Sequence, residues 1–139
     1  MIEDPPPLVF APPAERPSTE VVERFRGAPT SFVVDAMGGT GALDWRIKPL
    51  VGSSLVGIAL TCDCGPLDNL AFMAALADSL PGDVFVVATG GYVGAAVTGD
   101  LLIGVARNRH TSSSLIVCAS TPLAASMTIT AASTAVSTR

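Results

Sequence analysis

Apolar runs and helix-like patterns alternate along the middle of the chain. Residues 55–64 and 84–88 are short, almost continuous apolar runs, which predicts two strands buried on both faces of a sheet. Residues 68–79 and 100–109 carry apolar side chains at helical spacing, and a Pro-Gly-Asp turn follows the first of them. Strands that alternate with helices are typical of an α/β layered domain.

The apolar stripe of each predicted helix indicates the face that we expect to pack on the sheet. The stripes consist of Leu70, Met73, Leu76 and Leu80 in the first helix, and of Leu101, Leu102 and Val105 in the second. We therefore expect these side chains to be buried.

Two shorter helices are predicted ahead of the first strand. Ser18 is followed closely by two glutamates, the pattern of an N-cap with acids in the first turn, so a helix is expected over 19–26. A second helix is expected over 30–37, ended by a pair of glycines. Its apolar residues Phe32, Val33, Ala36 and Met37 fall on one face.

The two ends of the chain differ in composition from its middle. Residues 1–17 hold six prolines, which predicts an extended or disordered tail. Residues 18–118 form the predicted α/β domain, and 114–118 is compatible with one more strand. Residues 119–139 are dominated by Ser, Thr and Ala and have no glycine, so we interpret them as disordered or as a non-native continuation of the chain. A helix or strand packed on a partner is the alternative.

Composition narrows the possible partners. The 139 residues suffice for one domain, and a net charge of -4 with 5% aromatic residues gives no basic stripe for nucleic acid. The uncharged C-terminal stretch holds many Ser and Thr residues and Pro122, so no membrane span is expected. The three cysteines suggest no disulfide framework and the N-terminus has no signal-peptide pattern, so a cytoplasmic location is expected.

The strongest chemical signal is a glycine-rich stretch that leads into the last predicted helix. Backbone amides of Gly99, Asp100, Leu101 and Leu102 should lack helical acceptors and face outward at the positive end of the helix dipole, which predicts a site for a carboxylate or phosphate. Gly99 would let the ligand approach closely, and Asp100 would cap the helix or bind a cation through water. An ordinary strand-to-helix turn is the alternative. The stretch is neither a Walker P-loop nor a GxGxxG motif.

The cysteines and the single histidine carry a weaker signal. Cys62 and Cys64 fall on the same strand face. A metal site would need further ligands, and only Cys118 and His110 remain, so we interpret the two thiols as buried and structural. His110 is expected on the surface after the helix.

Six short motifs stand in the order and spacing of the RraA-like family. They are Asp35-Ala36-Met37, Ile47-Lys48-Pro49-Leu50, Leu55-Val56-Gly57, Asp68-Asn69-Leu70, Pro81-Gly82-Asp83-Val84 and Gly99-Asp100-Leu101-Leu102. Over about 28–109 the chain therefore resembles this family, which includes the 4-hydroxy-4-methyl-2-oxoglutarate aldolases and was once misnamed as dimethylmenaquinone methyltransferases.

The resemblance implies a swivelling β/β/α layered sandwich, incomplete here at the C-terminus, that assembles as a homotrimer or hexamer. It implies a class II pyruvate aldolase that depends on Mg²⁺ or Mn²⁺, cleaves 4-hydroxy-4-methyl-2-oxoglutarate or 4-carboxy-4-hydroxy-2-oxoadipate, and decarboxylates oxaloacetate. In such enzymes the amides of the Gly-Asp-Leu-Leu stretch hold the carboxylate of the small 2-oxo acid. The metal polarises the keto oxygen while C–C cleavage leaves an enolate.

The chain departs from the family pattern after its last helix. The family motif is an Asp, twenty residues, then Arg-Asp; counted from Asp100, the substrate-binding Arg falls at Thr121 and the metal-binding Asp at Pro122. His110 also replaces an expected glycine. Asp100 is thus the only matching motif residue, and we expect negligible aldolase activity and no metal site. A frameshift or truncation near codon 110 is our hypothesis for the departure.

Two other functions stay open. Some RraA-like proteins lack the metal-binding Asp and regulate a ribonuclease or helicase by binding it, which the missing Arg-Asp pair would also fit. A small structural subunit that pairs its open sheet edge with a partner is the third possibility.

Overall fold

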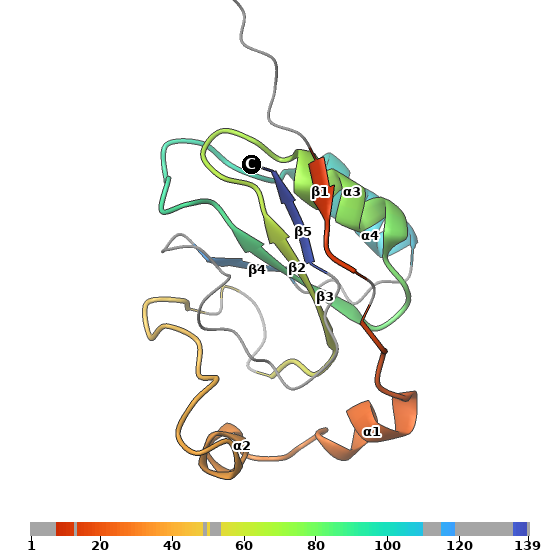
Figure 1. Ribbon diagram of the computed structural model, residues 1–139, viewed down its shortest axis with the longest axis vertical. Helices are drawn as coiled ribbons and strands as arrows, with labels where there is room; N and C mark the ends of the chain where they lie inside the picture. The colour runs from red at the N-terminus through yellow and green to blue at the C-terminus, as the bar shows by residue number, and fades with distance from the viewer. Residues whose placement is uncertain are drawn as a thin grey trace, which may run out of the picture.

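A computed structural model describes residues 8–12, 14–48, 50, 54–109, 115–118 and 135–138. The elements follow in the order β1 (Leu8–Phe10), α1 (Thr19–Arg24), α2 (Thr30–Ala36), β2 (Ile58–Asp63), α3 (Leu70–Asp78), β3 (Asp83–Ala88), α4 (Asp100–Asn108), β4 (Leu115–Cys118) and β5 (Ala135–Thr138), as Figure 1 shows. The fold is mixed α/β, as the alternating pattern predicts.

The strands form one sheet in the order β1-β5-β2-β3-β4. The neighbours β5, β2, β3 and β4 run parallel, and β1 pairs antiparallel with β5. The chain crosses from β2 to β3 through α3 and from β3 to β4 through α4, so parallel strands are joined by helices. The strands expected within 55–64, 84–88 and 114–118 are confirmed, with the first beginning three residues later than predicted.

The core lies between the sheet and α3. Phe72 of α3 meets Phe85 of β3 edge to face, with ring centroids 5.2 Å apart. Leu60 and Val87 belong to the same buried cluster. Val86, on the opposite face of the sheet, is buried as well. Burial on both faces explains why these strands are apolar without alternation.

The predicted stripe of α3 is wrong in three of its four positions. Only Leu76 is buried, whereas Leu70, Met73 and Leu80 are exposed. The buried face consists of Ala71, Phe72, Ala75 and Leu76. Nearly every residue of this helix is apolar, so the sequence repeat could not select a face, and small alanines let the helix approach the sheet closely.

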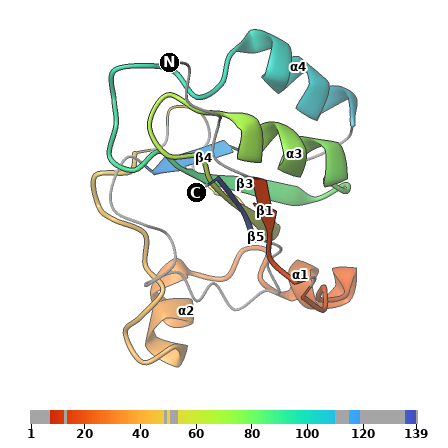
Figure 2. The same cartoon turned by 45° about the horizontal axis from the view of Figure 1, so that its top comes forward.

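The predicted stripe of α4 is also wrong in part. Leu102 packs against the core, but Leu101 is 82% exposed and Val105 is exposed, while the buried residue of this helix is Ala106. Figure 2 shows α4 beside α3, and the Arg109 side chain donates to the Ala77 carbonyl of α3 at 2.7 Å. Because α4 packs beside another helix, a narrow strip of small residues suffices for the contact.

Helices α1 and α2 stand apart from this core. The Ser18 hydroxyl accepts from the Val21 amide at 3.3 Å, which confirms the predicted N-cap. The helix ends at Arg24, two residues earlier than predicted. Neither α1 nor α2 has a buried residue, and Phe32 is 69% exposed. In Figure 1 both lie away from α3 and α4. Within the described residues no helix is long and apolar enough to cross a membrane.

Two strands fall in segments that the sequence assigns to tails. β1 lies in the proline-rich segment, where extended chain is expected, and β5 lies in the Ser/Thr/Ala-rich segment. β5 runs parallel to β2, pairing Thr61 with Ala135 and Asp63 with Ser137. Strand pairing depends on backbone hydrogen-bonding groups, which are common to residues of all types. The composition of a segment therefore predicts strand pairing poorly. Apart from β4 and β5, residues from 110 onward lie outside the described part.

Candidate functional site

A pocket of about 140 Å³ lies where β2 and β3 end. Its lining comes from the two connections that leave these strands: Gly65, Leu67, Asp68 and Asn69 before α3, and Thr89, Tyr92, Ala95, Ala96 and Val97 before α4. In open parallel sheets ligands bind outside the carboxyl ends of the strands. The position of the pocket therefore makes it the candidate site.

The wall that precedes α3 has an unusual backbone. Leu67 has a φ of 60° and is 74% exposed, a left-handed conformation that is costly for a side chain of this size. The Asp68 carboxylate accepts from the Leu70 amide, the first of α3, at 2.8 Å, while the N-cap Asn69 makes no side-chain cap hydrogen bond. Asp68 therefore satisfies an amide at the start of α3 and brings a carboxylate to the pocket lining.

The wall that precedes α4 begins with a closed turn. The Thr89 hydroxyl donates to the Tyr92 carbonyl at 3.0 Å, and the Tyr92 amide donates to the Thr89 carbonyl at 3.1 Å. Gly90 and Gly91 between them have φ values of 61° and 81°, which glycine adopts without strain. A Cβ built on Gly90 would stand 3.6 Å from the Pro66 ring, so the two walls lie close together there.

The predicted anion site forms the first turn of α4. Gly99 is the N-cap in extended conformation, and nothing lies within 4 Å of the point where a Cβ would stand. The Asp100 carboxylate accepts from the Leu101 amide at 2.9 Å, so that amide already has an acceptor, contrary to the prediction that all these amides are free. Capping of the helix by Asp100 is one of the two roles that the sequence predicts for this residue. The aspartate side chain is short enough to reach the amide of the next residue.

The pocket and the predicted anion site are neighbours along the chain. None of Gly99, Asp100, Leu101 and Leu102 lines the pocket, but Val97 does. Between them, the hydroxyl of Thr98 is shielded from solvent and has no hydrogen-bond partner among the described residues. Buried hydroxyls usually have such a partner. The segment that joins the pocket to the start of α4 therefore contains a polar group whose hydrogen-bonding capacity is unused among the described residues.

Sequence reasoning missed most of the pocket lining. It singled out Asp68 and Asn69 as part of a motif and the glycine-rich stretch as a helix approach, but not Leu67, Thr89 or Tyr92. Tyr92 is the single tyrosine of the chain and stands within the glycine-rich stretch, which was the available signal. The left-handed backbone conformation of Leu67 could not be predicted from the sequence.

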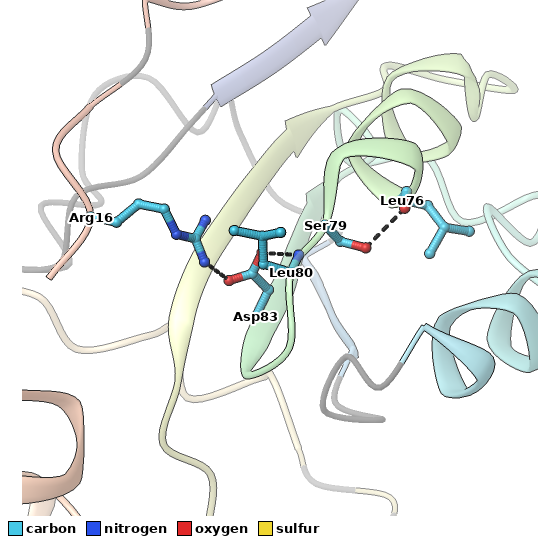
Figure 3. A network of polar contacts seen from close by, with 5 residues as sticks. All are labelled: Arg16, Leu76, Ser79, Leu80 and Asp83. Atoms are coloured by element: carbon cyan, nitrogen blue, oxygen red, sulfur yellow. Dashed lines mark hydrogen bonds and ion pairs between the residues drawn. The ribbon is translucent and has the colours of Figure 1, made fainter. Parts of the chain in front are cut away.

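The Pro-Gly-Asp motif lies at the opposite end of β3. Figure 3 shows Asp83, which is fully buried, accepting hydrogen bonds from the Arg16 guanidinium and, at 2.9 Å, from the Leu80 amide. The Ser79 hydroxyl donates to the Leu76 carbonyl at 2.8 Å, which closes the end of α3. This network ties the N-terminal segment to the turn between α3 and β3, so the motif serves the fold.

Gly57 explains the Leu-Val-Gly motif in the same way. A Cβ at Gly57 would stand 2.5 Å from the Gly82 carbonyl oxygen and 2.6 Å from the Val84 side chain. The Ile58 amide donates to the same carbonyl at 3.3 Å. Only glycine lets β2 begin this close to the turn before β3.

The prediction of buried thiols is confirmed for Cys62 and Cys64. Burial raises the pKa of both thiols, and that of Cys64 rises to about 11. In the described part of the chain, no three His, Cys, Asp or Glu side chains are grouped so that they could hold a metal ion. His110, Thr121 and Pro122 lie outside that part.

Comparison with known proteins agrees with the motifs. Residues 30–121 match the sequence model of a family described as RraA-like, Aldolase/RraA. A protein of Halalkalibacterium halodurans named "Putative 4-hydroxy-4-methyl-2-oxoglutarate aldolase" is 36% identical over 89 residues, which are 63% of this chain and 42% of that protein. The chain thus spans less than half of this relative, but the family match covers most of its own length. The chain belongs to the RraA-like family.

Proposed function

We propose that this chain binds the carboxylate of a small 2-oxo acid at the start of α4, as the substrate-holding part of a divalent-metal-dependent aldolase or decarboxylase. The observation that carries the proposal is the pocket at the ends of β2 and β3, whose lining reaches Val97, two residues before Gly99. The relative named as an aldolase of 4-hydroxy-4-methyl-2-oxoglutarate suggests the substrate class.

The first turn of α4 suits an anion. Helix geometry leaves the amides of Asp100 and Leu102 without intrahelical acceptors, and the helix dipole adds positive potential. Gly99 has neither a left-handed φ nor a neighbour within 4 Å that would require glycine. No contact within the described chain requires glycine at position 99. Close approach of a ligand would require it.

We propose that catalysis by this chain is impaired. Thr121 and Pro122 occupy the positions at which the family pattern has its substrate-binding Arg and its metal-binding Asp. Threonine carries no charge and proline has no ligand atom in its side chain. The described residues offer no group of donors that fits Mg²⁺ or Mn²⁺, so we derive no catalytic step through a metal.

A frameshift near codon 110 would account for this departure. Reading the coding DNA across codons 105 to 140 in all three frames tests the idea. Another frame that encodes Arg-Asp at 121 and 122 would support it, and three frames without that pair would contradict it.

We propose further that the chain works as a homo-oligomer, a trimer or hexamer, with the layered sandwich of its family. α1 and α2 bury no residue, and Phe32, Trp45 and Leu50 are 69%, 77% and 97% exposed. Apolar surface of this kind is typical of an interface. Light scattering on the purified chain tests this, and a monomer at micromolar concentration would contradict it.

The second candidate function is a non-catalytic RraA-like protein that regulates a ribonuclease by binding it. The observation in its favour is the same loss of Arg and Asp at 121 and 122. A regulator of this kind needs no 2-oxo acid, whereas the first proposed function does. A binding measurement with a 2-oxo acid therefore distinguishes the two functions.

The experiment is a calorimetric titration with pyruvate together with an oxaloacetate decarboxylation assay in Mg²⁺. We expect pyruvate to bind, with turnover near the uncatalysed rate. Rapid decarboxylation by the unmodified chain would contradict the impairment. Failure of pyruvate to bind would contradict the proposed function and favour the regulator.

A further inference from the structure

Helix α4 is attached to the rest of the molecule by a small apolar contact. Ala106 is its buried residue and Leu102 packs at the edge of the core, whereas Leu101 and Val105 are exposed. Apolar packing stabilises in proportion to the area that it buries. The packing of α4 therefore restrains the tilt of this helix only weakly.

A polar contact holds the C-terminal end of α4. Arg109 is the C-cap of the helix, and its guanidinium donates to the Ala77 carbonyl in the last turn of α3 at 2.7 Å. This is the short end of the range for N–H···O hydrogen bonds, as is typical of a charged donor. The bond joins the two helices that Figure 2 shows beside each other.

The sequence at the end of α3 makes the Ala77 carbonyl available. The helix ends at Asp78, and Ser79 is extended, with φ −66° and ψ 145°. The last carbonyls of a helix have no intrahelical donor, and the residue four positions after Ala77 is Pro81, which has no N–H. The C-terminal end of the helix dipole also favours a cation. The acceptor is therefore suited to the guanidinium that it meets.

The opposite end of α4 carries the proposed anion site. The helix has nine residues and is about 14 Å long. A change of tilt at the end held by Arg109 would therefore displace the amides of Asp100 and Leu102. Residues 92–99, which lead into the helix, form neither helix nor strand, so they restrain its first turn little.

We infer that Arg109 is a positioning residue for the proposed site. Its bond to the Ala77 carbonyl holds the C-terminal end of α4 and thereby sets the place of the first turn beside the pocket. This inference rests on the proposed function, because it explains how the same site keeps its geometry. Arg109 itself has no contact with the ligand.

The test is a calorimetric titration of the full chain with pyruvate. Arg109→Met keeps the length of the side chain and removes its donors, and it should bind pyruvate at least about 5-fold more weakly, within the range by which a distant contact couples to a binding site. Arg109→Lys should restore most of the affinity, because an ammonium group can also donate to the carbonyl.

The matched control is Arg107→Met. It removes the same charge from the last turn of the same helix, but Arg107 makes no hydrogen bond or ion pair within the part of the chain that the structure describes. Its affinity for pyruvate should equal that of the unmodified chain. The comparison separates the loss of the contact from the loss of a positive charge.

A second measurement needs no ligand. Amide resonances of 99–102 should shift in Arg109→Met, although they lie at the far end of the helix, and should stay in place in Arg107→Met. Because the bond between Arg109 and the Ala77 carbonyl is exposed, Arg109→Met should still fold, which the urea midpoint checks.

The outcomes separate this inference from the proposed function. If pyruvate does not bind the unmodified chain, the proposed function falls, and the inference falls with it because no site remains to be positioned. If pyruvate binds and Arg109→Met keeps the full affinity, or if Arg107→Met loses as much, only the inference is overturned. Unmoved resonances of 99–102 in Arg109→Met would also overturn the inference alone.

Discussion

The two ends of the strand pair β2–β3 have different roles, although their residue types are similar. At the amino end, Gly57 and Gly82 lie against each other and the buried Asp83 is held by Arg16 and the Leu80 amide. At the carboxyl end, the connections leave a pocket whose walls include the left-handed Leu67. The amino end is closed by tight contacts, whereas the carboxyl end keeps open space and a strained backbone.

The comparison teaches how to interpret the family motifs of this chain. Leu-Val-Gly and Pro-Gly-Asp meet at the closed end, where their residues hold the strands together. Asp-Asn-Leu and Gly-Asp-Leu-Leu stand at the starts of α3 and α4, on or beside the pocket. A motif at the amino ends of parallel strands thus relates to stability, and one at the carboxyl ends relates to ligand binding.

The largest effect is expected from Arg16→Ala, which removes the guanidinium from the fully buried carboxylate of Asp83. We expect a loss of roughly 3 kcal/mol in the free energy of unfolding, since breaking a buried ion pair leaves a charge poorly compensated. The urea midpoint measures it. The matched control is Arg26→Ala, whose pair with Glu23 is exposed and should leave the midpoint unchanged. Equal midpoints for both variants would contradict the structural role of the closed end.

Gly57→Ala should have the next largest effect on stability. Its Cβ would overlap the Gly82 carbonyl and the Val84 side chain, so β2 or the turn must move, at a cost of about 1–3 kcal/mol. Gly104→Ala in α4 is the control, because nothing lies within 4 Å of its Cβ and alanine favours a helix. Thermal melting should lower the midpoint of the first variant and raise that of the second. A stable Gly57→Ala protein would show that this contact is not required.

Gly99→Ala should separate binding from stability. The extended φ and the open space around Gly99 let alanine fit, so the free energy of unfolding should change by no more than about 1 kcal/mol. The added methyl group would stand where the ligand approaches, and pyruvate should bind about 10-fold more weakly, which corresponds to roughly 1.4 kcal/mol. Calorimetry on Gly99→Ala and Gly104→Ala checks this. Unchanged affinity would remove Gly99 from the site.

The smallest effect concerns the buried thiols and alkaline pH. Burial is the main cause that raises the pKa of Cys64 from 9.0 to about 11. A hydrogen bond from the Phe72 backbone acts in the opposite direction, and the charges of Asp68 and Asp63 raise the pKa further. The unfolded thiol then loses its proton first, so stability is complete below pH 9 and falls as pH rises towards 11. Cys64→Ala should make this fall shallower in urea titrations between pH 8 and 11. An unchanged slope would indicate that the thiol ionises equally in both states.

Local signals predicted the parts of the fold that local chemistry determines. The apolar runs located β2 and β3, Ser18 marked the start of α1, and the glycine-rich approach marked the start of α4. These features depend on neighbours in sequence, or on burial so complete that both faces of a strand are apolar.

The remaining features depend on contacts between distant segments. The face of α3 could not be chosen because its residues are nearly all apolar, and β5 forms through backbone pairing in a segment without a distinctive pattern. The candidate pocket combines two connections separated by a helix and a strand, so only the folded chain brings Leu67 near Tyr92. Sequence predicted the helix start beside this pocket but not the pocket itself.

The most direct test of this account is a pyruvate titration followed by amide NMR on the uniformly labelled chain. We predict that amide resonances of 65–69, 89–97 and 99–102 shift together with one affinity, while those of Gly57, Gly82 and Asp83 stay in place. Shifts centred on the closed end of the strand pair, or the absence of any shift at saturating pyruvate, would contradict the claim that the carboxyl end is the binding site.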